Sequence, residues 1–169
     1  KLVTIQDIKG DLHVHTKWSE GNASIEEMAT KASAKKLDYI AICDHSKSLG
    51  IAHGLDEGRL RNQMKEIDNL NKRLGNFTIL KGIECDIKAD GSMDLPNAVL
   101  RDLDWVIGSV HSSLRQNRDK MTERLISAIH NEHVNAIGHP TGRLIQKRRS
   151  LQIDLEKVFE AAANQGVMM

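Results

Sequence analysis

Histidines and carboxylates recur at the ends of apolar segments in this sequence. The first example is His13-Val14-His15, which closes a short strand-like segment. Side chains two residues apart on a strand share a face and lie about 7 Å apart along the chain, so both imidazoles could bind one divalent ion. The alternative is a pair of exposed polar residues on an edge strand. Four later apolar segments also end in residues of ligand type, which favours a metal site: Asp44-His45, Glu84, His111 and His139.

Together with Glu20, these residues are too many for a single tetrahedral zinc ion. The set suits two or three adjacent divalent ions, with Glu84 bridging two of them. Mixed nitrogen and oxygen donors favour manganese, zinc or iron over magnesium or calcium. Adjacent ions stabilise the attacking and leaving oxygens of a phosphoester and lower the pKa of a bound water. The predicted reaction is phosphoester hydrolysis, with a metal-bound hydroxide as the nucleophile.

The predicted ligands divide between ions. We expect His45 and Glu20 to hold a different ion from His13 and His15, because they come from the segments that follow the first and second strands. Asp44 could itself be a ligand, but its position beside His45 favours a role in orienting that imidazole by a hydrogen bond.

Three other histidines are weaker candidates for the metal site. His53 lies in a loop after the second strand and is a candidate for approaching the metals or binding substrate; an ordinary loop histidine is an equal alternative. His130 and His133 lie at the end of a predicted helix, where a positive charge interacts favourably with the helix dipole, so we expect them at the surface.

A basic segment follows His139. It contains Arg143 and the run Lys147-Arg148-Arg149. The default interpretation is a solvated charged surface. The alternative is a contact with substrate phosphates beside the active site, since Lys and Arg supply most contacts to a nucleic-acid backbone.

Strands and helices must alternate to position these residues. Apolar segments predict strands over 12–14, 39–43, 77–83, 105–110 and 134–138, with the start of a sixth at Val167. Helical spacing and capping residues predict helices over about 24–37, 56–74, 119–131 and 154–165, with Gly75 and Gly166 following two of them. Pro96 is expected to open a short helical turn.

This alternation predicts an α/β protein with parallel strands. An open doubly wound sheet would place the carboxyl ends of five strands in a row, where their ligands could not meet. In a (β/α) barrel those ends ring one site, so the barrel is favoured. Five strands and the start of a sixth do not close a barrel, and we expect residues 1–169 to be one incomplete domain of a longer protein.

Composition narrows the possible partners and location of the protein. A net charge of +1 over 169 residues argues against binding nucleic acid by bulk charge alone, although a local basic strip remains compatible with it. Cys43 and Cys85 form no Cys-x-x-Cys pair and are expected to be buried thiols, in keeping with a reducing cytoplasm. The sequence contains neither a long apolar run nor a signal peptide, so no membrane association is predicted. The oligomeric state is not predicted.

Five segments resemble the PHP (polymerase and histidinol phosphatase) family: residues 10–16, 42–46, 82–84, 108–111 and 138–140. Residues 44–55 resemble, more narrowly, the PHP domain at the carboxyl end of bacterial and archaeal family X DNA polymerases. The resemblance implies a distorted (β/α)7 barrel of TIM type, here truncated at its carboxyl end, with a trinuclear metal site. It also implies a manganese- or zinc-dependent phosphoesterase that acts on DNA ends in repair, as a 3′–5′ exonuclease or 3′-end phosphatase. A polymerase region of the same parent chain would be its partner.

The sequence departs from the family pattern at two places. The carboxylate after His-x-His is commonly Asp in the family, whereas the matching residue here is Glu20. The final Asp-x-His of the family would lie beyond Met169, so we expect an incomplete set of ligands and a fragment that binds metal weakly or is inactive. Two alternative functions remain: a small-molecule phosphatase of the histidinol-phosphate type, and a non-catalytic module stabilised by metal.

Overall fold

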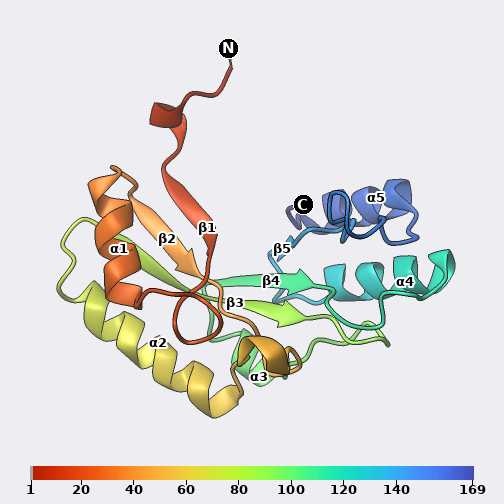
Figure 1. Ribbon diagram of the computed structural model, residues 1–169, viewed down its shortest axis with the longest axis horizontal. Helices are drawn as coiled ribbons and strands as arrows, with labels where there is room; N and C mark the ends of the chain where they lie inside the picture. The colour runs from red at the N-terminus through yellow and green to blue at the C-terminus, as the bar shows by residue number, and fades with distance from the viewer. Residues whose placement is uncertain (1) are drawn as a thin grey trace. The chain divides into compact units, whose positions relative to one another are not determined.

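The computed structural model describes residues 2–169, which form parallel strands joined by helices (Figure 1). The strands follow the sheet order β1-β2-β3-β4-β5. Strands consecutive in sequence are therefore neighbours in the sheet, as in a (β/α) barrel and unlike a doubly wound sheet, whose order reverses at a switch point. Their bounds are Gly10–Val14 (β1), Tyr39–Ile42 (β2), Thr78–Asp86 (β3), Trp105–Ser109 (β4) and Ala136–Ile137 (β5).

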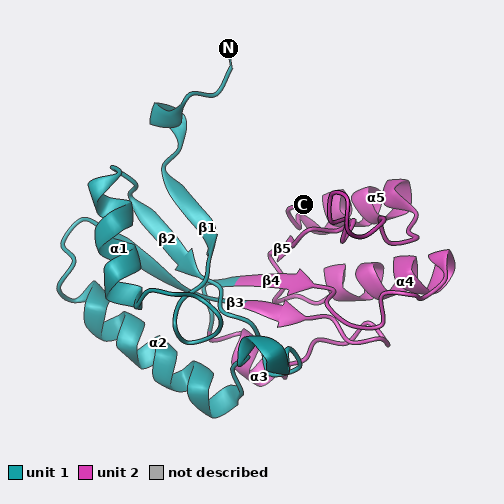
Figure 2. Cartoon of the chain, in the orientation of Figure 1, with its two compact units in different colours: residues 1–83, 103–105 teal, residues 84–102, 106–169 magenta. Residues whose placement is uncertain are grey.

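The helices are α1 (Ile25–Ala34), α2 (Glu57–Asn71), α3 (Asn97–Leu100), α4 (Arg118–Ile129) and α5 (Leu155–Gln165), with short 3-10 helices at Ile5–Asp7 (η1) and Gly50–Ala52 (η2). No described helix is long and apolar enough to cross a membrane. Two compact units divide the chain (Figure 2): the first runs to Ile83 and includes Leu103–Trp105, and the second contains Glu84–Asp102 and Val106–Met169.

In the first unit, β2 pairs in parallel with β1 and with the beginning of β3. Helix α1 begins at the predicted capping box: the Ser24 side chain accepts from the Glu27 amide, and the Glu27 carboxylate accepts from the Ser24 amide. Its apolar face contributes Ile25 and Ala29 to a core that also contains Ile40 of β2.

Helix α2 begins after Asp56, as predicted, but ends earlier than expected. The Asn71 side chain binds the backbone of Ile79 through both its amide and its oxygen, at 2.8 and 2.9 Å. These bonds join the helix end to β3, so Leu74 lies beyond the helix. Gly75, with φ 58°, serves the following turn and is not the residue that closes the helix.

In the second unit, two predicted strands have different lengths from those expected. Strand β3 continues to Asp86, and the Ile87 amide then donates to the Ser109 carbonyl at 2.7 Å. Glu84 therefore lies within a strand and not at its end. Strand β5 is confined to two residues, and the Val134 amide before it bonds within the preceding turn to Asn131.

The carboxyl-terminal elements follow the predictions closely. Asn117 and Asp154 cap α4 and α5, and Gly166 ends α5 in the left-handed region with φ 69°. A parallel bridge between Ala136 and Met168 confirms the start of a sixth strand beside β5. Both cysteines are buried and form no disulfide, as expected.

Candidate metal centre

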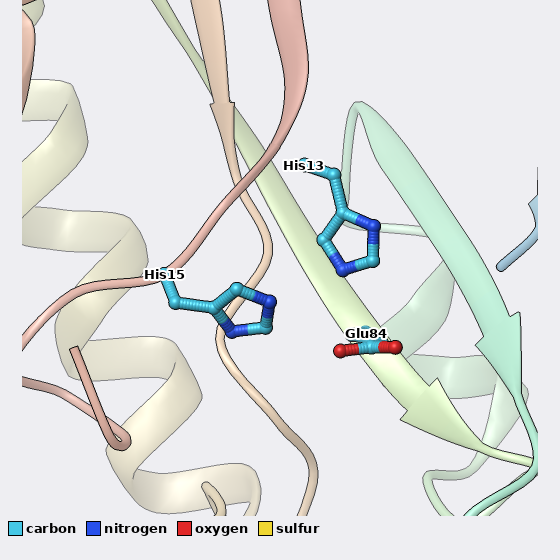
Figure 3. A group of neighbouring side chains, drawn as sticks. All are labelled: His13, His15 and Glu84. Atoms are coloured by element: carbon cyan, nitrogen blue, oxygen red, sulfur yellow. The ribbon is translucent and has the colours of Figure 1, made fainter. Parts of the chain in front are cut away.

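The two histidines of the His-x-His segment lie at the carboxyl end of β1, and their ring centroids are 5.0 Å apart (Figure 3). The Asp11 carboxylate accepts from the His13 amide at 3.0 Å, which fixes the backbone at the start of the segment. Both side chains are partly exposed. The spacing of two residues thus brings two imidazoles together, as the sequence predicts.

The loop after β1 turns back and places Glu20 between two imidazoles. The amides of Ser19 and Gly21 both donate to the Thr16 carbonyl, at 3.1 and 2.9 Å. As a result, Glu20 Oε1 lies 3.2 Å from His15 Nδ1 and 3.2 Å from His45 Nε2. The ligand atoms of the three residues all lie within 4.8 Å of one another, close enough to surround one ion.

The expected division assigned His45 and Glu20 to a different ion from His13 and His15. In the structure His15 lies beside His13 and also forms a group with Glu20 and His45, so it could bind with either set, and the division stays a prediction. The electrostatics of the group favour an ionised carboxylate. Partial burial acts to raise the pKa of Glu20, but a hydrogen bond from Ser19 and the charges of His45 and His15 outweigh it. The pKa of Glu20 is therefore lowered from its ordinary value.

Asp44 supports the same loop from within the unit. Its buried carboxylate accepts four hydrogen bonds: from the Thr16 amide (2.7 Å), the Thr16 hydroxyl (2.7 Å), the Ser19 hydroxyl (2.5 Å) and the Gln63 amide group (2.7 Å). None of these donors is the ring of His45, in contrast to the expected role. Adjacent residues of an extended chain point to opposite sides, so Asp44 faces away from its neighbour and instead holds the turn that carries Glu20.

In the second unit, one buried carboxylate oxygen faces two imidazoles. Glu84 extends from β3 (Figure 3), and its Oε1 lies 2.9 Å from His139 Nε2 and 3.4 Å from His111 Nε2. The Glu84 side chain is only 2% exposed, whereas His139 is 46% exposed. The three donors come from β3 and from the residues that follow β4 and β5. Both imidazole nitrogens thus lie beside one carboxylate oxygen, and mixed oxygen and imidazole donors suit zinc, manganese or iron.

His139 reaches this position with a strained backbone. Its φ is 32°, in the left-handed region that non-glycine residues rarely adopt. A side chain at the preceding residue is also excluded, because a Cβ at Gly138 would lie 2.5 Å from Ser109 Oγ. Such strain persists where the surrounding structure fixes it, and it often marks functional sites.

Sequence reasoning missed Asp86, whose Oδ1 lies 2.6 Å from His111 Nδ1. Burial of His111 acts to lower its pKa, but hydrogen bonds to Asp86 and Glu84 and their charges outweigh burial and raise the pKa to about 9. A carboxylate at Nδ1 directs Nε2 outward and is the usual partner of a metal-binding histidine. The available signal was the alternation in Glu84-Cys85-Asp86, which places both carboxylates on one face of an extended strand.

Other predicted residues stand apart from these groups. The His53 side chain is exposed, its φ is 53°, and it belongs to none of the metal-binding groups found among the described residues. His130 is exposed at the end of α4, with Nδ1 2.8 Å from the Ile126 carbonyl oxygen, as expected of a residue at a helix terminus.

The predicted basic residues lie together and are all exposed. Arg143, Lys147, Arg148 and Arg149 line a hollow of about 320 Å³. Arg148 also has a structural role, because its Nε donates to the Gly142 carbonyl at 2.8 Å.

Comparison with known proteins agrees with this geometry. The chain is 48% identical over 162 residues to the DNA polymerase/3′-5′ exonuclease PolX of Bacillus subtilis (strain 168), covering 96% of the chain and 28% of that protein. It is 36% identical over 163 residues to a probable phosphatase of Thermoanaerobacter sp. (strain X514), covering 92% of the chain and 61% of that protein.

A solved structure shares the fold: the histidinol phosphate phosphatase of Lactococcus lactis subsp. lactis, complexed with zinc, L-histidinol and phosphate. It aligns with 95% of this chain and 72% of its own, with a TM-score of 0.61 and 16% identity. The family described as "PHP domain" matches residues 11–167. The α/β fold, the donors that follow its parallel strands and this match over nearly the whole length show that the chain belongs to the PHP domain family.

Proposed function

We propose that the chain is a metal-dependent phosphoesterase domain that hydrolyses DNA phosphodiesters or 3′-end phosphates. The observation that carries the proposal is the buried Glu84 carboxylate oxygen that faces the Nε2 atoms of His111 and His139. A carboxylate buried in this way needs positive charge beside it, which a protonated imidazole or a divalent ion can supply. A divalent ion would take the place of the imidazole protons and bind the same oxygen and nitrogen atoms.

Each unit supplies its own group of candidate metal ligands. Glu84, His111 and His139 would hold metal in the second unit, while His15, Glu20 and His45 would do so in the first, with His13 as a further donor. Bound divalent ions would acidify a water molecule and neutralise charge on the phosphate oxygens. When metal binds, Asp86 would hold the proton of His111 on Nδ1, so that Nε2 could act as the metal donor.

DNA is the proposed substrate class because of the basic segment and the similarity to the Bacillus subtilis protein. The four cations at 143–149 form no ion pair with any described residue, which leaves them available to phosphates. Since the chain spans 28% of that relative, a polymerase region would belong to another part of the parent protein.

A small-molecule phosphatase is the second candidate, and the similarity to the Thermoanaerobacter protein, described as a probable phosphatase, favours it. A non-catalytic module is less well supported, because each family ligand position within the chain carries a residue able to bind metal.

The test compares three substrates with manganese titrated in: a 3′-recessed duplex DNA, histidinol phosphate and a small chromogenic phosphodiester. The full-length protein is compared with a variant in which Arg143, Lys147 and Arg149 are changed to Glu. We expect slower DNA hydrolysis and a flatter salt dependence, by about 0.9 in log–log slope for each phosphate that the variant no longer neutralises, with the chromogenic substrate unaffected.

The matched control changes three exposed lysines of helices α1, α2 and α5 to Glu: Lys31, Lys65 and Lys157. Equal slowing on DNA and on the chromogenic substrate would make the basic segment a structural support. Faster hydrolysis of histidinol phosphate than of DNA would favour the small-molecule phosphatase.

A further inference from the structure

The basic segment forms an ordered hairpin with an apolar tip. The Leu144 amide donates to the Arg148 carbonyl at 3.0 Å, and the Arg148 amide donates back to the Leu144 carbonyl at 2.9 Å. At the base of the hairpin, the Leu151 amide donates to the Thr141 carbonyl at 2.7 Å. A tip held in this way loses little conformational entropy when it binds a partner.

Two large apolar side chains occupy this tip. Leu144 is 48% exposed and Ile145 is 77% exposed. The turn that presents them passes through Gln146, with φ 61°. Leu144 and Ile145 are adjacent in a hairpin whose backbone is held by hydrogen bonds, and nothing in the described second unit covers either side chain.

Positive charge surrounds the apolar tip. Arg143 precedes it and Lys147, Arg148 and Arg149 follow it, and no Asp or Glu occurs between Glu132 and Asp154. The same hollow of about 320 Å³ is lined by these cations, by Leu144 and by Gln146. An apolar wedge flanked by phosphate-binding cations is the combination with which proteins separate stacked base pairs.

The hairpin begins close to a predicted metal ligand. The Gly142 amide donates to the His139 carbonyl at 2.8 Å, and the His139 ring faces Glu84 at 2.9 Å. A nucleic-acid strand that follows the cations would therefore arrive at the donor group of the second unit with its end already unstacked.

We propose that Leu144 and Ile145 form a wedge that opens the last base pair of a duplex DNA end, while the neighbouring cations bind the phosphates of the released strand. This inference rests on the proposed function and names its substrate: a paired 3′ terminus that must be frayed before hydrolysis.

The test replaces both tip residues with Ser and keeps every cation. The control is Phe159→Ser on α5, which removes a side chain of similar exposure, 49%, in the same unit. A duplex with 2-aminopurine at its terminal pair is bound to the full-length protein in the presence of a chelator, so that fluorescence reports unstacking without hydrolysis. Hydrolysis with manganese is then measured on paired and on single-stranded 3′ ends.

We expect the wild type and Phe159→Ser to raise the fluorescence and the double variant not to do so. Unstacking a base step opposes hydrolysis of a paired end, so the double variant should hydrolyse the paired end about tenfold more slowly, and the single strand at an unchanged rate. Equal slowing on both ends, or DNA hydrolysis by the wild type without a fluorescence rise, would overturn the wedge alone. A wild type that neither binds nor hydrolyses DNA would overturn the proposed function.

Discussion

Replacing Arg124 should loosen the backbone beside Asp86 and His111 in the second unit. This α4 residue is 2% exposed, and its guanidinium donates to the Ile87 carbonyl through Nε and Nη2. Its Nη1 donates to the Ser112 carbonyl at 3.0 Å and to Gln116 Oε1 at 3.2 Å. Since Ile87 follows Asp86 and Ser112 follows His111, one side chain fixes the backbone beside both members of the Asp86–His111 pair.

The magnitude follows from the hydrogen bonds that the substitution removes. Arg124→Met keeps most of the stem but leaves the buried Ile87 carbonyl and the more exposed Ser112 carbonyl without a charged donor, at about 1.5–3 kcal/mol for each hydrogen bond. Part of this is recovered, because burial of the guanidinium is itself unfavourable and lowers its pKa from the ordinary value. We therefore expect a net loss of about 3 kcal/mol in the free energy of unfolding, which corresponds to a Tm lower by about 6–12 °C.

Thermal and urea unfolding in the presence of a chelator measure this loss without any contribution from metal. The control, Arg118→Met, removes an exposed arginine of the same helix whose ion pair with Asp154 (3.1 Å) should contribute below about 1 kcal/mol. Metal affinity should fall for Arg124→Met and recover in part for Arg124→Lys. A residue that only stabilised the fold would leave the metal affinity of the folded protein unchanged. An Arg124→Met protein as stable as the control, with unchanged metal affinity, would refute the reasoning.

Two further predictions concern the metal donors. Asp86→Asn should weaken metal binding about 10–100-fold, since the hydrogen bond that orients His111 becomes neutral; calorimetric titration with manganese or zinc measures this, and unchanged affinity would contradict it. If metal is present at about 100 times its Kd, removing it with a chelator should lower the free energy of unfolding by about 2.7 kcal/mol, which corresponds to a Tm lower by about 5–10 °C. The chelator should lower the Tm of Glu84→Gln much less. An identical Tm shift in wild type and variant would show that Glu84 is not a ligand.

The sequence was most informative where a local rule acts alone. The capping box of Ser24 and Glu27 depends on four consecutive residues, and it formed as predicted. The same holds for Gly166, whose left-handed φ ends α5. Apolar segments located the strands because buried parallel strands require them.

What the sequence did not reveal depends on contacts between distant residues. Asp44 lies beside His45 in the chain, yet its bonds go to residues 16, 19 and 63. The fold of the 16–21 turn, which brings Glu20 to His15, likewise follows from backbone bonds that no periodicity encodes. Asp86 was missed because strand β3 was expected to end before it.

Strand β3 also determines where this chain can be cut. The division between the two compact units falls between Ile83 and Glu84, inside one continuous strand, and residues 103–105 return to the first unit (Figure 2). A split-protein reporter severed at this boundary would expose unpaired backbone amides and carbonyls in both halves, a template for aggregation. Neither unit is thus an exchangeable module, and fragment complementation or circular permutation should open the chain at the exposed turn around Gly75 instead.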